Sequence, residues 1–438
     1  MRLAALLVFL LPGLVQAQGQ NNYGSIYSLY GVGERVEYGS SQSAMMGHAN
    51  ASLRSGTYVG LTNPALWADQ AVTTFSAGAS LATVRGEDAL TQGSSVTTAG
   101  DVSSVHLGIP LIPSRLGVAV AYRPYSRVNY RAATAGSISV EDSLESFVSN
   151  LEGTGGLQQL TAGVGVRLGS AVQLGASADV LFGTQEFLRR VQFVDSDGNN
   201  NNDFAETREA RSTRLRGLTA TLGAAFTALS LARDDDALTV AGSLTLPTSV
   251  DADRSTTLGE SLDRDTLRTP DGSLSIDGDV NLPLVARGGI SYQSGGRWSA
   301  TLGGLYEPWS NFESTLPLGG FDSASGVDVL RDRWQVGGGF EITPAGRDPR
   351  ASALRRTSYR LGAYAERGLY RPEDQNVNTL ALTGGFSLPN RFTGARIDLG
   401  FELGTRGSAT GVLVRDRFLK GTLTINFGER WFIRRQFN

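Results

Sequence analysis

The stretch AVQLGASADVLF, residues 171–182, alternates between two kinds of side chain along its whole length. One face carries Val172, Leu174, Ala176, Ala178, Val180 and Phe182, and the other carries Gln173, Gly175, Ser177 and Asp179. A period of two predicts a β-strand whose two faces meet different surroundings. In a soluble sandwich the apolar face would pack into a core, whereas in a transmembrane barrel it would face lipid. The alternation by itself leaves both architectures open.

The same alternation recurs along the chain, for example in RLGVAVAYR (115–123), ARIDLGFEL (395–403) and LKGTLTINF (419–427). It predicts fourteen strands, at about 72–83, 102–109, 115–129, 157–168, 171–194, 209–232, 237–247, 283–294, 297–308, 329–343, 353–370, 376–388, 392–406 and 412–427.

The connections between these strands separate the two architectures. The even-numbered connections are mostly tight turns, whereas most odd-numbered ones are long and polar, at 84–101, 130–156, 195–208, 248–282 and 309–328. Short turns at one end and long loops at the other are typical of outer-membrane barrels, and an even strand number places both termini on the periplasmic side. We therefore predict an all-β, 14-stranded antiparallel transmembrane β-barrel. Within the loops, 140–153 fits a short amphipathic helix and 251–279 a flexible surface loop.

Composition narrows the possible functions. The chain has 438 residues, 55 of them Gly, and no Cys, so disulfides and thiol chemistry are excluded. No segment after the N-terminus approaches about 18 consecutive apolar residues, which excludes a transmembrane helix. The formal charge is −3 and Lys420 is the sole lysine, and no basic block predicts nucleic-acid binding.

The N-terminus has the three regions of a secretory signal peptide. MRLAALLVFLLPGLVQA, residues 1–17, predicts cleavage after Ala17, with an N-terminal membrane anchor as the alternative. We expect residues 18–70 to form a hatch inside the lumen, 71–428 the barrel, and 429–438 a periplasmic tail. Small residues in SAMMGHANASLRSGTYVGLTNPALWAD (43–69) would pack on the lumen wall, and Asn63, Pro64 and Ala65 would turn the chain into strand one. A disordered periplasmic tail is the alternative for this segment.

Catalytic motifs are missing from the sequence. The two histidines, His48 and His106, lie in different contexts, and there is no HExxH or CxxC motif, so we expect no enzyme. Acidic residues on the predicted lumen face (Asp179, Glu341, Asp398 and Glu402) accompany Arg167, Arg333, Arg360 and Arg396. Inward charges of this kind favour a salt-bridged lining over an acid/base pair.

One loop resembles a calcium-binding sequence. In DSDGNNNNDFAE, oxygen-bearing side chains fall at positions 1, 3, 5, 9 and 12, namely Asp195, Asp197, Asn199, Asp203 and Glu206. The required Gly is displaced, because Gly198 lies at position four and Asn200 at position six. A solvated turn is the alternative to a Ca²⁺ site, and no other cofactor is predicted.

The third predicted strand contains a proline. Pro124 lacks an N–H for the ladder, and the alternation changes phase between Tyr122 and Tyr125. We predict a kink or bulge of this strand at Pro124, Tyr125 and Ser126. The alternative is that Pro124 ends the strand at the membrane rim.

Several motifs, taken in order, resemble the FadL/OmpP1/TodX family of outer-membrane transporters, especially its Bacteroidetes-like versions. They are SIYSLYGVGE (25–34), SAMMGHANAS (43–52), NPALW (63–67), YRPYSRVNY (122–130), GTGGLQQLTAGVGVRL (153–168), VLFG (180–183) and GERWFIRRQF (428–437). The resemblance implies a fourteen-stranded barrel closed by an N-terminal hatch, with a lateral exit near the third strand. It thereby implies a gating role for two groups of residues, Asn63, Pro64 and Ala65 in the hatch and Pro124, Tyr125 and Ser126 at the kink. The chain departs from the family pattern in the residues after Phe427, where better-known members end.

The resemblance implies passive uptake of hydrophobic small molecules, such as long-chain fatty acids or aromatic hydrocarbons, by a monomer in contact with outer-membrane lipid. The alternatives are a PorV-like barrel that binds exported proteins, and a plain porin-like barrel.

Overall fold

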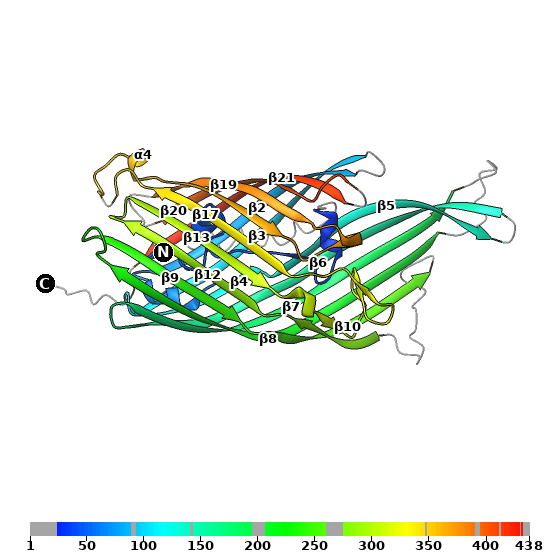
Figure 1. Cartoon of the computed structure of the whole chain (residues 1–438), viewed down its shortest axis with the longest axis horizontal. Coiled ribbons are helices and arrows are strands. Elements are labelled where there is room, and N and C mark those ends of the chain that lie inside the picture. The colour runs from blue at the N-terminus through cyan, green and yellow to red at the C-terminus, as the bar shows by residue number, and fades with distance from the viewer. Residues whose placement is uncertain are drawn as a thin grey trace, which may run out of the picture.

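The computed structural model describes residues 24–88, 93–140, 143–194, 206–259, 275–346, 348–389, 395–410, 413–429 and 431. Antiparallel strands wrap into a closed barrel in which the first and last wall strands pair, from Thr73 opposite Glu429 to Asp88 opposite Val414 (Figure 1). The predicted signal peptide lies outside the described residues.

Seventeen strands form the wall: β2 (Thr73–Asp88), β3 (Ser94–Ile112), β4 (Leu116–Pro124), β5 (Ser126–Val140), β6 (Ser143–Leu168), β7 (Val172–Phe193), β8 (Thr207–Leu229), β9 (Asp236–Thr245), β10 (Thr248–Gly259), β11 (Ser275–Leu282), β12 (Val285–Ser294), β13 (Trp298–Glu307), β17 (Arg333–Ile342), β18 (Ser358–Arg367), β19 (Asn378–Pro389), β20 (Ala395–Arg406) and β21 (Val414–Glu429). Three strands of the barrel are each interrupted and form two halves. β4 and β5 both pair with β6, and β9 and β10 both pair with β8. β11 and β12 pair with β10 and β9, respectively. The predicted fourteen-stranded barrel is confirmed.

The remaining elements are short. They are β1 (Glu34–Arg35), β14 (Glu313–Ser314), β15 (Phe321–Asp322), β16 (Val327–Asp328), the helices α3 (Ser41–Ala44) and α4 (Ala353–Arg356), and the 3₁₀-helices η2 (Ile26–Leu29), η3 (Pro64–Asp69), η4 (Trp309–Asn311) and η5 (Pro372–Asp374). Among the described residues, no helix has the length and apolarity needed to cross a membrane.

The faces of the wall strands are inverted relative to a soluble protein. On β7, Val172, Leu174 and Phe182 are about 40% exposed, whereas Gln173 is 2% exposed and Asp179 is fully buried. The carboxylate of Asp179 accepts hydrogen bonds from the hydroxyls of Thr161 and Thr221 on the neighbouring strands. An apolar exterior with a polar interior is the arrangement of a membrane barrel, so this observation excludes the soluble sandwich.

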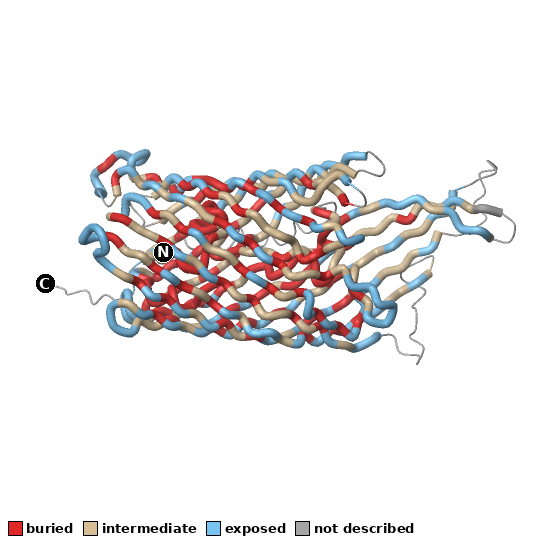
Figure 2. Tube along the Cα trace, viewed as in Figure 1, coloured by how far each residue is buried: buried red, intermediate tan, exposed pale blue. Residues whose placement is uncertain are grey.

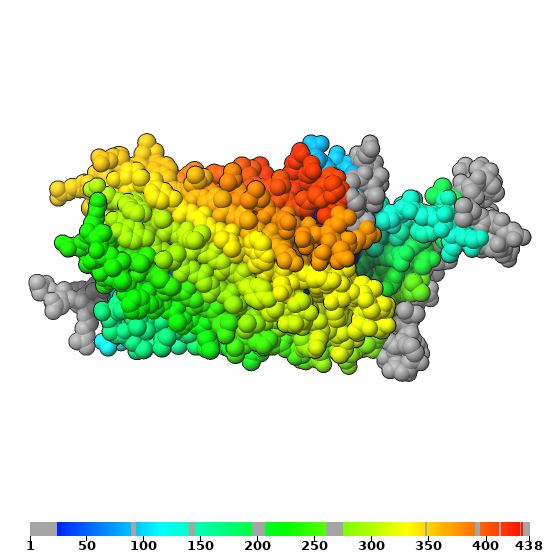
Figure 3. Space-filling view, viewed as in Figure 1, coloured from blue at the N-terminus to red at the C-terminus, as the bar shows by residue number. Residues whose placement is uncertain are grey.

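Four strands, β5 to β8, run well beyond the rest of the wall (Figures 1 and 3). Crossing a bilayer takes about 10 residues, whereas β6 has 26. Figure 2 shows that this extension consists mainly of exposed and intermediate residues.

Three sequence-based expectations about the loops are wrong. Much of the predicted loops 84–101 and 130–156 is paired strand, residues 143–153 of the predicted amphipathic helix lie in β6, and the described parts of 251–279 lie in the paired strands β10 and β11.

Residues 24–70 lie inside the barrel, between opposite walls. On one side, η3 packs against β4, β6, β7 and β8. On the other, the hydroxyl of Ser41 donates to the carboxylate of Asp398 on β20. Wall glycines make the close approach possible: a Cβ on Gly175 would lie 2.3 Å from the carbonyl carbon of Pro64, and one on Gly117 would lie 2.0 Å from the carbonyl oxygen of Trp67.

This packing predicts the effect of enlarging Gly175. Gly175→Val forces the backbone at Pro64 away from the wall, and we expect a loss of about 1–3 kcal/mol in stability, as for an overpacked core. Thermal unfolding in detergent measures it. The matched control is Gly421→Val, because a Cβ on Gly421 meets no atom within 4 Å. Equal melting temperatures of the two variants would contradict close packing on this wall.

The lumen side of the wall is lined by ion pairs, as the inward charges predict. Arg360 pairs with Glu341 at 2.5 Å, and Arg287 pairs with Glu37 of the enclosed segment at 2.9 Å. Burial disfavours a charge on Glu37, but the adjacent Arg287 guanidinium holds the pKa of that carboxyl well below its usual range. The enclosed segment is thus bonded to the wall by charge as well as by packing.

Candidate functional site

The third membrane strand is broken in the middle of the wall. β4 ends at Pro124 and β5 begins at Ser126, while the partner strand β6 continues past both without interruption. Tyr125 keeps one link to β6, from its N–H to the carbonyl of Leu157 at 2.9 Å. Proline cannot donate to the ladder, which explains the position of the break.

The break leaves two strand edges facing each other. β3 pairs with β4 only from Val105 to Ile112, and no pairing of β3 with β5 is found in the described part of the chain. We call the interval between Ser94–Ser104 of β3 and the start of β5 the seam. It lies where the blue η2 appears beside β5 in Figure 1.

Residues 24–36, which we call the seam segment, occupy this interval. The N–H of Gly24 donates to the carbonyl of Asn129 on β5 at 2.9 Å, and the hydroxyl of Thr97 on β3 donates to the carbonyl of Gly24 at 3.4 Å. At the start of β5, β1 of the segment pairs with Ser126 and Arg127. The segment therefore bonds to both edges and closes the wall there in place of a continuous strand.

Tyr27 fixes the segment to the last wall strand. Its hydroxyl donates to the carbonyl of Val414 at 2.6 Å. Burial raises the pKa of Tyr27 above its usual range, so this hydroxyl keeps its proton and remains a donor.

Arg35 ties the seam segment to the break itself. Its Nη1 donates to the carbonyl of Tyr125 at 2.5 Å, and its guanidinium lies 3.5 Å from the centre of the Tyr125 ring. Its Nη2 pairs with Glu307 of β13 at 3.1 Å. Glu307 in turn pairs with Arg333 at 3.2 Å and accepts from Trp309 Nε1 at 2.7 Å. The buried carboxylate of Glu307 thus connects the seam segment to Arg333 and Trp309.

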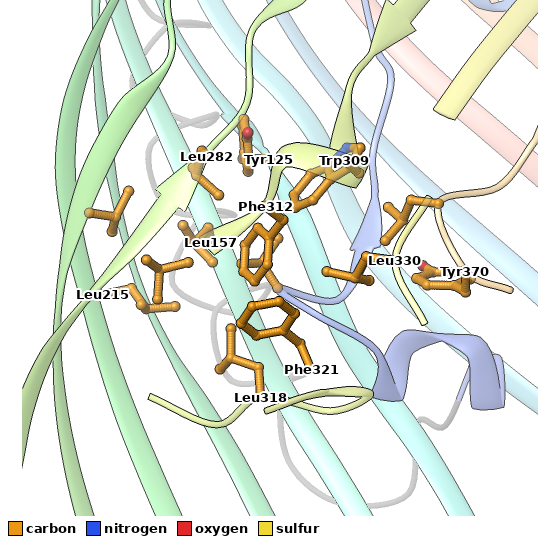
Figure 4. Packing of buried hydrophobic residues seen from close by; sticks show 14 of the residues in the cluster. Tyr125, Leu157, Leu215, Leu282, Trp309, Phe312, Leu318, Phe321, Leu330 and Tyr370 are labelled. Carbon is orange, nitrogen blue, oxygen red and sulfur yellow. The ribbon is translucent and has the colours of Figure 1, made fainter. Parts of the chain in front are cut away.

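Trp309 belongs to an apolar cluster of buried side chains inside the barrel (Figure 4). Trp309 and Phe312 lie 5.5 Å apart, and Phe312 meets Phe321 edge-to-face at 4.9 Å. Wall residues close the cluster on one side, among them Leu157, Leu181, Leu215 and Leu282. The protein's own side chains therefore occupy the apolar part of the lumen.

A cavity of about 160 Å³ lies behind the seam segment. Its lining is strongly charged and includes Glu34, Arg127, Glu366, Glu402, Arg406 and Lys420. A charged lining disfavours an apolar solute, so this cavity is not the place where a hydrocarbon would rest.

A profile of the BamG family matches residues 1–438. The chain belongs to the BamG family. The comparison with curated proteins finds no match.

Solved structures resemble this BamG-family chain in fold. A FadL homologue of Pseudomonas aeruginosa is 12% identical, with 90% of this chain and 99% of that chain covered and a TM-score of 0.57. The toluene transporter TbuX of Ralstonia pickettii is 13% identical, with 90% and 99% covered and a TM-score of 0.55. The toluene transporter TodX of Pseudomonas putida is 13% identical, with 91% and 99% covered and a TM-score of 0.53. At these identities the likeness shows a shared FadL-type barrel architecture.

The structure separates the gating residues singled out in the sequence of this BamG-family protein. Tyr125 and Ser126 lie at the seam, where the hydroxyl of Ser126 donates to the carbonyl of Val32 at 2.7 Å. Asn63, Pro64 and Ala65 lie away from it, against β6, β7 and β8, where the Asn63 side chain accepts from the N–H of Ala65 at the start of η3.

Sequence reasoning missed Arg35 and Glu307, which are 272 residues apart and meet only in the fold. Of the suggested calcium ligands, Asp195, Asp197, Asn199 and Asp203 lie outside the described residues. Glu206 is described, and it pairs with Arg208 at 2.5 Å.

Proposed function

We propose that the protein is an outer-membrane passage for hydrophobic small molecules, such as long-chain fatty acids or aromatic hydrocarbons. A solute would enter past the cluster around Trp309 and leave sideways at the seam. The observation that carries the proposal is the third strand, which is broken at Tyr125 and where the seam segment, and not a continuous strand, closes the wall. The work done is partitioning, and no chemical step is proposed.

Three further points support this proposal. Two structures of the same fold are described as toluene transporters. The lumen cluster is apolar, so a hydrophobic solute could replace its contacts. The strands beside the break have an apolar outer face, with Val120 of β4 and Leu160 of β6 exposed, so a solute released sideways there would meet lipid. Export by a cleaved signal peptide, membership of a Bacteroidetes-like branch, a monomeric state and calcium in the 195–206 loop stay predictions.

A disulfide across the seam tests the lateral exit. An ideal Cβ on Gly24 lies 3.8 Å from Cβ of Asn129, which matches the spacing of a disulfide, and the natural chain has no Cys to compete. We expect the double variant Gly24→Cys/Asn129→Cys to lose uptake of a radiolabelled fatty acid or toluene when oxidised. Reductant should restore uptake.

Each single variant is the control, because neither can form the internal bond. Full uptake by the oxidised double variant, with the disulfide verified by mass spectrometry, would rule out exit through the seam. Ion conductance without binding of any hydrophobic solute would instead favour a porin.

The second candidate function is a PorV-like barrel that binds exported proteins. It is favoured by the edge of β5 after Asn129, with which no described strand pairs on the β3 side. An open edge of this kind is a template for an added strand. Stoichiometric co-purification of an exported protein from native membranes, lost on Ala135→Pro in β5, would support it over transport.

A further inference from the structure

The inner face of the projecting sheet holds a second cavity, of about 230 Å³, that the proposed passage does not use. We call it the arginine pocket. One part of its wall is apolar and comprises Leu29, Tyr130, Phe187 and Leu318. The other part carries three guanidinium groups, those of Arg189, Arg211 and Arg254, and a single carboxylate, Glu209. The pocket is therefore amphipathic and carries an excess of positive charge.

Arg254 is the centre of this excess. It is only 6% exposed. Its Nε donates to the hydroxyl of Thr213 at 2.9 Å and its Nη1 to the carbonyl of Pro317 at 2.6 Å, which aims the guanidinium between the wall and the loop that covers it. No carboxylate pairs with it in the described part of the chain. Burying a cation without a counter-ion is costly, so an anion from outside the chain would relieve that cost.

The neighbouring charges do not supply that anion. Arg211 pairs with Glu209 at 2.5 Å, so this carboxylate is already engaged, and Arg211 lies close enough to Arg254 to repel its charge. Arg189 donates from Nε to the hydroxyl of Ser149 at 3.2 Å and has no ion pair among the residues described. Within the described residues, two guanidinium charges, on Arg189 and Arg254, are thus left without an ion pair.

We propose that the arginine pocket binds the phosphate head of an amphiphile, with the apolar body against Tyr130, Phe187 and Leu318. A dianionic phosphate neutralises two guanidinium groups, whereas a carboxylate neutralises one. Guanidinium forks also match phosphate geometry in two parallel hydrogen bonds. A neutral hydrocarbon would leave both charges unpaired, and that of Arg254 is buried.

The size of the pocket limits what it encloses. A complete drug-sized ligand takes roughly 300–1,000 Å³, so about 230 Å³ holds the head and the first part of the chain. The remainder of the amphiphile extends toward the mouth of the barrel. This inference goes beyond the proposed passage and holds whether or not the bound molecule is transported.

Calorimetry on the full-length protein in a neutral detergent tests the site with four probes: dodecyl phosphate, dodecanoate, dodecanol and inorganic phosphate. We expect dodecyl phosphate to bind most tightly. Arg254→Gln should weaken its binding at least about tenfold, the loss expected for a charge-assisted pair. Arg189→Gln, at an exposed position where the fold tolerates change, should also weaken it. The control is Arg216→Gln, on the outer face of β8, which should bind as the natural protein does.

Each alternative result overturns the proposal. Dodecanol binding as tightly as dodecyl phosphate would show that the arginines contribute nothing. Dodecanoate binding equally well would show that a single charge suffices. Inorganic phosphate binding as tightly as dodecyl phosphate would show that the apolar chain of the amphiphile contributes nothing to binding. Unchanged binding in both Arg254→Gln and Arg189→Gln, with dodecyl phosphate still bound, would place the site elsewhere.

Discussion

Arg35→Met is expected to loosen the seam segment and to raise the ion conductance of the barrel in planar bilayers. The Arg35 side chain is 3% exposed, bonds to Glu307 and to the carbonyl of Tyr125, and stacks on the Tyr125 ring. Removing one partner of a buried ion pair typically costs about 3–5 kcal/mol, because the other charge stays buried. Glu307 keeps Arg333 as a partner, so we expect the barrel to persist while the segment detaches.

The control for Arg35→Met is Arg208→Met, which breaks the partly exposed pair with Glu206. Exposed pairs contribute about 0–1 kcal/mol, so this variant should melt and conduct like the natural protein. If Arg35→Met and Arg208→Met behave alike in both measurements, Arg35 does not hold the seam closed.

Trp309→Ala is expected to open an apolar cavity in the lumen at a cost of about 3–5 kcal/mol in stability. Trp309 is 1% exposed and packs on Phe312, and its indole N–H is bonded to Glu307. Engineered apolar cavities of about 150 Å³ bind benzene, so the new space should bind toluene. Melting temperature with and without toluene reports both effects.

Trp334→Ala is the matched control for Trp309→Ala, because Trp334 is 40% exposed on the outer face of β17. It should show no stabilisation by toluene. A Trp309→Ala variant that loses stability but gains nothing from toluene would mean that its neighbours collapse into the space, and the cluster would then be no gate.

The wall could be predicted from the sequence because lipid and lumen impose a two-residue period. In AVQLGASADVLF the period identifies which side chains face lipid, down to the buried Asp179. The period fades where both faces meet water. The small polar residues of 84–101 therefore predict a loop, although most of them lie in the hairpin of β2 and β3.

For the interior of the barrel, the sequence predicts the type of lining but not which residues contact each other. Inward charges predicted a salt-bridged lining, but no local pattern indicates that Arg35 meets Glu307 or that Gly175 faces Pro64. Such contacts depend on how a 47-residue stretch, residues 24–70, is enclosed by strands that follow it. Pro124 marked one break in the wall. Pro247 and Pro283 lie at two more, between β9 and β10 and between β11 and β12, and the same signal would have predicted them.

The pairing of β2 with β21 has a consequence for biogenesis. The ring is completed by the last strand of the chain, whereas the enclosed residues 24–70 precede every wall strand. Residues 24–70 are therefore synthesised before the barrel that encloses them. Until β21 pairs with both neighbours, the edges of β2 and β20 stay open, and residues 24–70 can enter the lumen through the gap between these two strands. Enclosure of residues 24–70 and closure of the barrel are therefore coupled. A chain truncated before Val414 would lack β21, so its barrel would not close and residues 24–70 would not be enclosed.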